Sequence, residues 1–321
     1  MRAAIVSEHK AQPSLGERPA PLAAEGRAIV QLRAAALNPA DVAIASGLFP
    51  AGSPPLPYVP GVEGVGTVLE SGRFAAGTRV WASGRGLGVA ADGTFAEQFS
   101  AADEVLVEVP AAADDVVAAA VGVAGLAGWL PLAWLAPVRA GETVLVLGAT
   151  GNVGAVAIQA AKLLGAGKVV AVGRDENRLA RLGELGADDA VALGGDDFRE
   201  RLAAAVAGSP PTLVLDALWG EPLEAALAVA APGARIAHVG QSAGPTATVV
   251  SGLVRGKQLQ ILGYTNFAVP LDAVEKGYTD LVAHAVAGRL QLDIETVPLD
   301  RFTEAWARQT QGPDTKLVLV P

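Results

Sequence analysis

Apolar and polar residues follow different patterns in the two parts of the chain. From about residue 140, continuous apolar runs of strand length alternate with segments whose apolar residues recur at helical spacing. Apolar runs of this kind are typical of strands buried on both faces of a parallel sheet. The pattern predicts a doubly wound α/β domain of the Rossmann type. The expected strands are 143–147, 168–172, 190–193, 212–216, 235–239 and 259–263, and the expected helices are 153–164, 176–185, 198–206 and 222–230.

Before this region the chain is interrupted by Gly and Pro at short intervals. Its brief β-prone runs predict an irregular, mostly antiparallel β domain. After residue 266 the alternation stops, and we expect this tail to join the N-terminal β domain. A length of 321 residues also favours two domains. We predict one domain from 1–120 with 266–321, and a second from 121–265. The expected elements outside the second domain are strands at 27–33, 66–69, 79–81, 105–109 and 316–320, and helices at 271–287 and 303–309.

Composition narrows the chemistry that this chain can perform. Hydrophobic residues make up 51% and charged residues 18%, which is typical of a folded globular protein. The net charge of −9, with basic residues scattered, argues against nucleic-acid binding. The chain has no cysteine and three histidines, so thiolate ligands and a cysteine nucleophile are excluded, and we expect no catalytic transition metal.

One segment resembles a membrane span in length. Residues 116–138 carry no charge, but they are rich in Ala, Gly and Val and contain Pro131 and Pro137. We interpret them as buried helices near the domain boundary. The first residues lack an apolar run of signal-peptide length, so we expect a cytoplasmic protein that does not bind membranes.

The glycine-rich segment 148–154 carries the main functional signal. It reads GATGNVG and lies between an expected buried strand and an expected helix, the context that a dinucleotide-binding turn requires. Glycine at 151 lets the backbone approach a pyrophosphate, and glycine at 154 lets the helix pack close to the strand. The helix N-terminus then provides backbone N–H groups for the phosphates. The residues expected to bind them are Ala149, Thr150, Gly151, Asn152 and Val153.

The end of the next strand indicates which dinucleotide binds. It reads Val172, Gly173 and Arg174, where an NAD-preferring site would place a carboxylate for the ribose hydroxyls. A guanidinium suits the 2′-phosphate of NADPH, and Arg178 adds a second cation one helical turn later. We predict NADPH as the cofactor, bound through Gly173, Arg174 and Arg178. The alternative is that Arg174 is a solvated cation and that Asp175 takes the ribose.

Several segments together resemble the medium-chain dehydrogenase/reductase superfamily, and within it the zinc-free quinone oxidoreductase branch related to zeta-crystallin. The resemblance covers nearly the whole chain. It implies a GroES-like catalytic domain formed by both chain ends, a Rossmann domain between them, and a cleft for nicotinamide and substrate. The matching segments are AALNPADVAIASGLFP (35–50), PGVEGVGTV (60–68), AAGTRVWA (75–82), DGTFAEQF (92–99), the AxGxxG turn at 149–154 and KLVLVP at 316–321.

The resemblance also shows which family residues are absent. Zinc-dependent relatives carry Cys where Asn38 stands and His where Val62 stands, and a four-cysteine lobe is missing. Tyrosines common in similar quinone reductases are replaced by Ala43 and Phe49, and a Thr near the nicotinamide is replaced by Ala127. Without a metal to stabilise an alkoxide, the substrate must delocalise negative charge itself. The expected reaction is NADPH-dependent reduction of a quinone or an α,β-unsaturated carbonyl.

Two groups of polar residues are candidates for the reacting end. The family motif places Asn38 and Asp41 at the cleft, Asn38 as a donor to a developing oxyanion and Asp41 as an orienting group. The same Asn-Pro-x-Asp sequence is also an ordinary capped helix start, and both readings stay open. After the later strands, Gly240 and Gln241 on one side, and Tyr264, Thr265 and Asn266 on the other, are expected near the nicotinamide.

Other matching residues have simpler interpretations. For Glu63 and Lys316 we expect a packing or domain-tethering role. The side chains that suggest an apolar small-molecule acceptor are Ala43, Phe49, Tyr58 and Trp81.

Three further possibilities follow from the sequence. The segment GQSAG at 240–244 matches a serine-hydrolase elbow, with Asp272 and His284 following, but Pro245 and β-branched residues after it favour a loop over the required helix. The lost tyrosines are compatible with a non-catalytic NADPH-binding protein. The expected edge strand at 259–263, together with the resemblance, suggests a homodimer.

Overall fold

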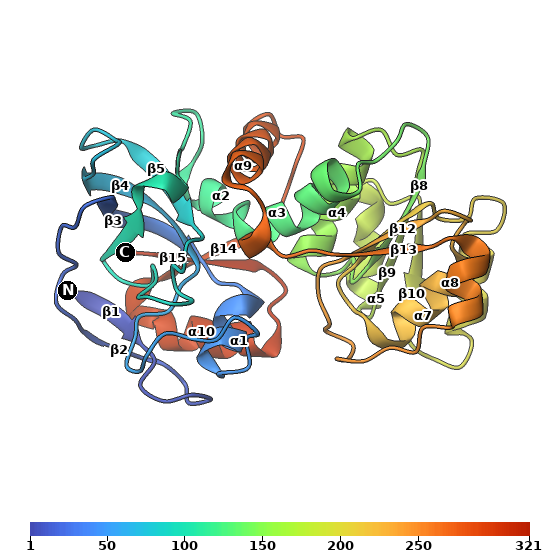
Figure 1. The fold of residues 1–321 in the computed structure, drawn as a ribbon, viewed down its shortest axis with the longest axis horizontal. Coiled ribbons are helices and arrows are strands. Elements are labelled where there is room, and N and C mark those ends of the chain that lie inside the picture. The colour runs from blue at the N-terminus through green and yellow to red at the C-terminus, as the bar shows by residue number, and fades with distance from the viewer. The chain divides into compact units, whose positions relative to one another are not determined.

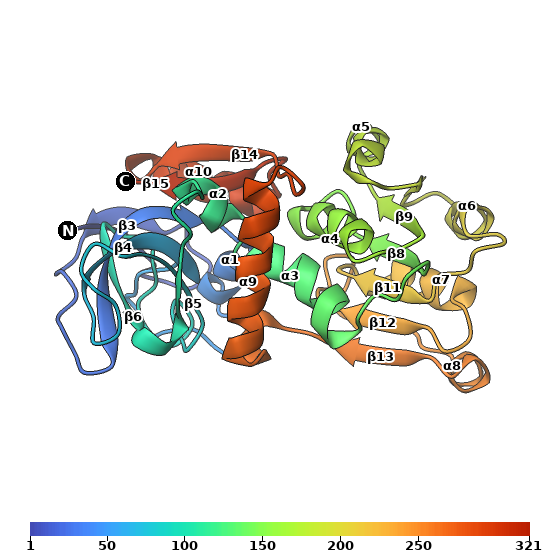
Figure 2. The same ribbon diagram turned by 90° about the horizontal axis from the view of Figure 1, so that it is seen from above.

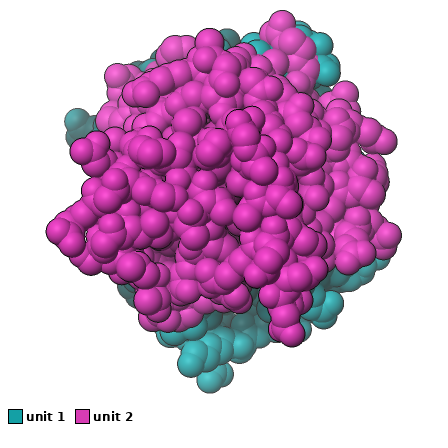
Figure 3. Space-filling model, turned by 90° about the vertical axis from the view of Figure 1, so that its right-hand side faces the viewer, with its two compact units in different colours: residues 1–124, 278–288, 292–321 teal, residues 125–277, 289–291 magenta.

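The computed structural model describes residues 1–321, which form two compact units (Figure 1 and Figure 3). Unit 1 contains residues 1–124, 278–288 and 292–321, and unit 2 contains residues 125–277 and 289–291. Unit 1 is therefore assembled from both ends of the chain, whereas unit 2 is nearly continuous in sequence.

Unit 1 is built on a mixed seven-stranded sheet. Its strand order is β14-β15-β3-β4-β5-β7, and β6 pairs with β3. The predicted joining of the chain ends is confirmed, because β15 pairs antiparallel with β3 through Val318 and Ala36. The strands are β3 (Arg27–Ala36), β4 (Glu63–Glu70), β5 (Arg79–Ser83), β6 (Gln98–Ala102), β7 (Leu106–Glu108), β14 (Ile294–Pro298) and β15 (Lys316–Val320), with a separate hairpin of β1 (Arg2–Ile5) and β2 (Ser14–Glu17).

The helices that lie wholly in unit 1 are short. They are α1 (Pro39–Ala45), α2 (Asp115–Ala120) and α10 (Phe302–Gln311), and the longer α9 (Leu271–Val286) has residues in both units. Single helical turns precede β7 and α10, at Asp103–Val105 and Leu299–Arg301. The core includes a stacked pair of rings, Trp81 and Tyr278, whose centroids lie 4.3 Å apart.

Unit 2 contains a six-stranded parallel sheet in the order β10-β9-β8-β11-β12-β13. Figure 2 shows β9, β8, β11, β12 and β13 side by side in this order. This order reverses direction beside β8, the topological switch point at which doubly wound sheets bind ligands. The prediction of a Rossmann-type domain is confirmed. The strands are β8 (Thr143–Leu147), β9 (Lys168–Gly173), β10 (Asp189–Ala192), β11 (Leu213–Asp216), β12 (Arg235–His238) and β13 (Gln260–Gly263).

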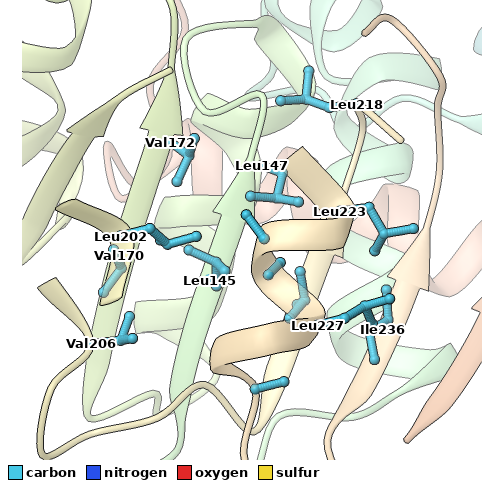
Figure 4. Packing of buried hydrophobic residues seen from close by; sticks show 14 of the residues in the cluster. Leu145, Leu147, Val170, Val172, Leu202, Val206, Leu218, Leu223, Leu227 and Ile236 are labelled. Atoms are coloured by element: carbon cyan, nitrogen blue, oxygen red, sulfur yellow. The ribbon is translucent and has the colours of Figure 1, made fainter. Parts of the chain in front are cut away.

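A buried apolar layer covers one face of this sheet (Figure 4). Leu145, Val170 and Ile236 from the strands pack against Leu202 and Leu223 from the helices, and all five are at most 1% exposed. Continuous apolar strands are required because helices lie over the sheet. The helices of unit 2 are α3 (Val123–Leu130, which begins in unit 1), α4 (Asn152–Leu163), α5 (Glu176–Arg181), α6 (Phe198–Ala205), α7 (Gly220–Val229) and α8 (Ser251–Lys257).

The structure differs from the sequence prediction mainly in short elements. Strands β1, β2, β6 and β14 and helix α8 were not predicted, because runs of four to seven residues carry too little periodicity. Helix α1 was expected only as one of two interpretations of the Asn-Pro-x-Asp sequence. Helix α5 ends at Arg181 and continues as a tighter turn, Leu182–Leu185. The uncharged segment 116–138 forms α2, α3 and a π-helical turn, Pro131–Leu135. None of the helices combines the length and the hydropathy needed to cross a membrane.

Candidate cofactor site

Residues 148–154, here called the phosphate turn, join the carboxyl end of β8 to the N-terminus of α4. Gly148 has a φ of 85°, in the left-handed region that favours glycine. A Cβ at Gly154 would collide with the carbonyl oxygen of Gly148 and lie 2.5 Å from the Cα of Ala149. Glycine at both positions is therefore required by the backbone of the turn itself.

The first turn of α4 has no side-chain cap. Its N-cap residue is Gly151, which has no side chain to accept hydrogen bonds from the first helix amides, and its backbone carbonyl oxygen accepts from the N–H of Ala155. The N–H groups of Asn152 and Val153 therefore have no partner within the helix, and the helix dipole adds partial positive charge there. A Cβ at Gly151 would meet only the Gly148 carbonyl oxygen, at 3.5 Å, so the backbone at this position is open to approach. The turn fits the pyrophosphate of a dinucleotide.

Two neighbouring segments pack so closely against the phosphate turn and the first turn of α4 that only glycine fits at the point of approach. A Cβ at Gly173, the last residue of β9, would lie 2.5 Å from Cγ2 of Thr150. A Cβ at Gly128 of α3 would lie 2.6 Å from the carbonyl oxygen of Val153. The predicted residues 149–153 and Gly173 are thus brought together. Sequence reasoning missed Gly128, whose requirement arises only from the packing of α3 on α4.

Arg174 directly follows β9, and its side chain is exposed. It makes no hydrogen bond or ion pair with another residue. Asp175, the carboxylate that would compete for a ribose, is the N-cap of α5, and its Oδ1 accepts a 3.0 Å hydrogen bond from the backbone N–H of Arg178. The end of β9 therefore presents an unpaired guanidinium, while its neighbouring carboxylate is engaged in the helix cap.

A buried carboxylate and a histidine lie at the ends of the next two strands. Asp216, the last residue of β11, is fully buried, and its Oδ1 accepts 2.9 Å hydrogen bonds from the backbone N–H groups of Leu218 and Trp219. Its Oδ2 lies 3.0 Å from Nδ1 of His238, the last residue of β12. The rings of Trp219 and His238 pack at a centroid distance of 4.2 Å. Sequence reasoning missed this pair, although Asp216 ends one predicted strand, 212–216, and His238 lies one residue before the end of the next, 235–239.

Trp219 has an unusual backbone conformation, with φ of 58° and ψ of −162°. This region is almost restricted to glycine, and occupying it costs about 1–3 kcal/mol. Such strain persists only where the surroundings enforce it, and the Asp216 hydrogen bond and the His238 ring contact are two such restraints.

The predicted residues that follow β12 and β13 lie close to their strand ends. A Cβ at Gly240 would lie 3.0 Å from the carbonyl oxygen of Ala217, and Gln241 is exposed. The Tyr264 hydroxyl lies 2.6 Å from Oδ1 of Asn266 and 3.3 Å from the carbonyl oxygen of Leu126. Burial raises the pKa of the Tyr264 hydroxyl. Tyr264 and Asn266 are therefore paired with each other, and their contact with a nicotinamide stays a prediction.

In unit 1, Asn38 and Asp41 form the start of α1. Asn38 is the N-cap, and the backbone N–H of Asn38 donates a 2.8 Å hydrogen bond to Oδ2 of Asp41. Oδ1 of Asp41 accepts a second hydrogen bond, of 2.9 Å, from the N–H of Val62. Both side chains are at most 2% exposed. This is the capped helix start that the sequence allowed, and the predicted roles of both residues toward the substrate stay predictions.

Asn38 also connects two buried charged residues. Its Nδ2 donates to Oε1 of Glu63 at 2.7 Å, and its Oδ1 accepts from Nζ of Lys316 at 2.7 Å. The four side chains Asn38, Asp41, Glu63 and Lys316, here called the buried polar cluster, are all at most 2% exposed. The packing role expected for Glu63 and Lys316 thus takes the form of a bridged ion pair.

Burial governs the protonation of this cluster. It raises the pKa of Asp41 to about 7, against two backbone hydrogen bonds that favour the charged form. It also raises the pKa of Glu63 and lowers that of Lys316. Oε2 of Glu63 accepts hydrogen bonds from the Val123 N–H at 2.7 Å and from Trp81 Nε1 at 3.0 Å. Glu63 therefore satisfies the first amide of α3 as well as the cluster.

The residues expected to form an apolar wall differ in exposure. Tyr58 and Trp81 are each 1% exposed and belong to the core of unit 1, whereas Ala43 and Phe49 are half-buried.

The structure around Ser242 does not form the strand-to-helix turn that a serine-hydrolase elbow requires. Ser242 lies in a loop after β12, its hydroxyl donates to the carbonyl oxygen of Ala217 at 3.1 Å, and the next helix begins only at Ser251.

Comparisons with known proteins identify the class. Residues 24–111 match the alcohol dehydrogenase GroES-like domain, and residues 152–283 match the zinc-binding dehydrogenase family. A quinone oxidoreductase from Pseudomonas aeruginosa is 34% identical over 71% of this chain and 69% of its own length. The chain therefore belongs to the medium-chain dehydrogenase/reductase family, and it is a homologue of quinone oxidoreductases.

Two further relatives extend the comparison. The phenolphthiocerol synthesis polyketide synthase Pks15/1 of Mycobacterium bovis is 35% identical over 70% of this chain, which spans only 10% of that protein's length. The structure of Escherichia coli quinone oxidoreductase complexed with NADPH superimposes with a TM-score of 0.88, at 23% identity, over 100% of both chains. This second likeness shows the shared fold.

The polar groups of the chain suit the anionic parts of a dinucleotide better than a metal ion. No group of three or more His, Asp or Glu side chains is arranged to hold a metal ion, although one matching family is described as zinc-binding. Asn38, which stands where zinc-dependent relatives carry cysteine, has both its side-chain atoms engaged in the buried polar cluster. The uncapped α4 amides and Arg174, in contrast, match the anionic groups of a dinucleotide.

Proposed function

We propose that this protein is an NADPH-dependent oxidoreductase that reduces a conjugated acceptor, a quinone or an α,β-unsaturated carbonyl, without a metal ion. The observation that carries the proposal is the uncapped N-terminus of α4 at the switch point of the sheet, with the unpaired Arg174 at the end of the neighbouring strand. Relatives named quinone oxidoreductases, one of them in complex with NADPH, support it.

The phosphate turn and β9 would bind the two anionic parts of NADPH. Residues 149–153 would surround the pyrophosphate, which the N–H groups of Asn152 and Val153 would bind where the helix dipole favours negative charge. The N–H groups of Ala149 and Gly151 already donate to the carbonyl oxygens of Val172 and Gly148 and hold the shape of the turn. Arg174, with Arg178 one turn later, would hold the 2′-phosphate by charge-assisted hydrogen bonds. Gly173 keeps the end of β9 close to the turn by leaving room for Thr150.

The chemistry that NADPH supplies when bound is a hydride from C4 of its nicotinamide. A conjugated acceptor spreads the resulting negative charge over its own atoms, so hydrogen bonds suffice where an alcohol would need a Lewis acid. Gly240, Gln241, Tyr264 and Asn266 are the proposed contacts of the nicotinamide half.

Asn38 and Asp41 are proposed as positioning residues. Both N–H groups of the Asn38 side chain are already donated, to Glu63 Oε1 and to the carbonyl oxygen of Ala36 at 3.1 Å. A further bond to a developing oxyanion would have to replace one of these. Asp41 fixes the start of α1 through the Asn38 and Val62 amides.

A second candidate is a non-catalytic NADPH-binding protein. It is favoured by Ala43, Phe49 and Ala127, which stand where similar reductases carry hydroxyl donors.

We also propose a homodimer paired through β13, an edge strand of the unit 2 sheet, and sedimentation measurements would test this assembly.

Stopped-flow mixing of the NADPH-loaded protein with a panel of acceptors separates these candidates. Rapid loss of NADPH absorbance with 1,4-quinones or 2-alkenals is expected, with no comparable oxidation of secondary alcohols by NADP⁺. Tight binding without turnover on any acceptor would instead favour the binding protein. Efficient alcohol oxidation would contradict metal-free chemistry.

A further inference from the structure

The carboxyl ends of β11 and β12 hold an acid–histidine pair that neither the phosphate turn nor the buried polar cluster includes. Asp216 is fully buried: its Oδ1 accepts hydrogen bonds from two backbone N–H groups, and its Oδ2 lies 3.0 Å from Nδ1 of His238. The side chain of His238 is 26% exposed. One edge of the imidazole is thus fixed inside the unit, and part of the ring remains open to solvent.

The strand order of unit 2 indicates which part of a dinucleotide would lie over this pair. Arg174 follows β9, the phosphate turn follows β8, and β11 and β12 come next in the sheet (Figure 2). If Arg174 takes the 2′-phosphate and the phosphate turn takes the pyrophosphate, the remaining nicotinamide half extends over the ends of β11 and β12. Asp216 and His238 are the last residues of those two strands.

The chemistry of the pair defines the group that it would bind. An ionised carboxylate only accepts hydrogen bonds, so Nδ1 of His238 must carry the proton. In the neutral ring Nε2 is then an acceptor, which suits a hydroxyl donor. The nicotinamide-side ribose carries two hydroxyls. Trp219, packed on the imidazole at 4.2 Å, restrains the plane of the ring.

We propose that His238, oriented by Asp216 and Trp219, accepts a hydrogen bond from a ribose hydroxyl in the nicotinamide half of NADPH. This inference rests on the proposed NADPH site and adds a contact for the half of the cofactor that carries the hydride. It differs from the predicted contacts Gly240, Gln241, Tyr264 and Asn266 in using a side chain whose tautomer is fixed by a buried acid.

Two ligands separate the halves of the cofactor in a binding experiment. NADPH contains the nicotinamide half, whereas adenosine 2′,5′-bisphosphate contains only the part that Arg174 and the α4 amides would hold. Calorimetric titration of the full chain with each ligand gives two dissociation constants for each variant. The measurement needs no turnover, so it does not depend on the identity of the acceptor.

The informative variants are His238→Asn and His238→Gln. Asparagine can keep a donor toward Asp216 but has no atom at the place of Nε2, and we expect it to weaken NADPH binding about 5- to 10-fold, the value of one neutral hydrogen bond. Glutamine places its terminal amide near Nε2 and should recover part of the loss. Binding of the bisphosphate should be unchanged in both. Asp216→Asn should weaken NADPH binding to a similar extent as His238→Asn, because the tautomer of His238 is no longer fixed.

Two control variants complete the design. His9→Asn changes a histidine of unit 1 whose Nδ1 contacts the carbonyl oxygen of Ala45, and it should leave both constants unchanged. Arg174→Ala should weaken both ligands. Equal losses of both ligands in His238→Asn, or no loss of either, would overturn the inference while leaving the NADPH site intact. Failure of the unmodified protein to bind either ligand would overturn the proposed function and this inference together.

Discussion

The phosphate turn of unit 2 and the buried polar cluster of unit 1 are built in opposite ways. The turn consists of consecutive residues and presents backbone N–H groups that no side chain caps. The cluster gathers side chains from α1, β4 and β15, with sequence separations as large as 278, and almost every polar atom in it is paired. The unpaired N–H groups of the phosphate turn indicate where a ligand can bind. The paired side chains of the buried polar cluster indicate where the fold of unit 1 is fixed.

The saturated cluster should be the more sensitive of the two to substitution. Glu63→Ala would leave the Val123 amide, Trp81 Nε1 and one Asn38 N–H without acceptors, and it would leave the Lys316 ammonium with Asp41 as the remaining carboxyl of the cluster. Removing one partner of a buried ion pair costs about 3–5 kcal/mol. Urea unfolding should show this loss. Glu70→Ala, at the exposed end of the same strand, is the matched control, and equal effects of the two variants would contradict the assigned network.

The second-largest expected effect is a pH dependence of the unfolding free energy caused by Asp41 of the buried polar cluster. Burial raises the pKa of Asp41 from 3.8 to about 7, so the folded state keeps a proton that the unfolded state has lost. The contribution of Asp41 is therefore most favourable below pH 4 and is lost as the pH rises to about 7, by at most about 4 kcal/mol. The check is the difference in unfolding free energy between the unmodified protein and Asp41→Asn from pH 4 to 8. A difference independent of pH would refute the assignment.

Two glycine substitutions should separate packing from ligand approach in the phosphate turn. Gly154→Ala collides with backbone atoms of the turn and should cost about 1–3 kcal/mol of stability as well as NADPH affinity. In Gly151→Ala the new Cβ meets only one oxygen, at an ordinary distance, so the melting temperature should be unchanged. The same Cβ would occupy the side from which the pyrophosphate would approach. Only the NADPH affinity of this variant should fall. Equal affinity in Gly151→Ala and the unmodified protein would argue against phosphate binding here.

Arg174→Ala tests the cofactor preference. A charge-assisted hydrogen bond is worth about 1.5–3 kcal/mol, so NADPH should bind about 10- to 100-fold more weakly. NADH, which lacks the 2′-phosphate, provides the internal control and should bind with unchanged affinity. Fluorescence titration of both dinucleotides measures the two values. Unchanged NADPH affinity would remove Arg174 from the site.

The same contrast explains how much could be predicted from the sequence. The phosphate turn could be located because its strand, glycines and helix are contiguous and each has a local signature. The strands of unit 2 were found within one or two residues because they are continuous apolar runs. The pairing of Asn38 with Glu63 and Lys316 could not be found, because it depends on the register of distant strands. Asp216 and His238 were missed because neither lies in a recognised motif, and their contact depends on the register in which β11 pairs with β12.

Strand β15 has a consequence for the order of folding during synthesis. Lys316 at its start must reach Leu37 and Asn38 before the buried charges of unit 1 are compensated. Unit 2, which comes almost entirely from residues 125–277, has no such requirement. Domains generally form as their residues leave the ribosome. Unit 2 can therefore be complete while the first 124 residues, although made earlier, still wait for their last strand.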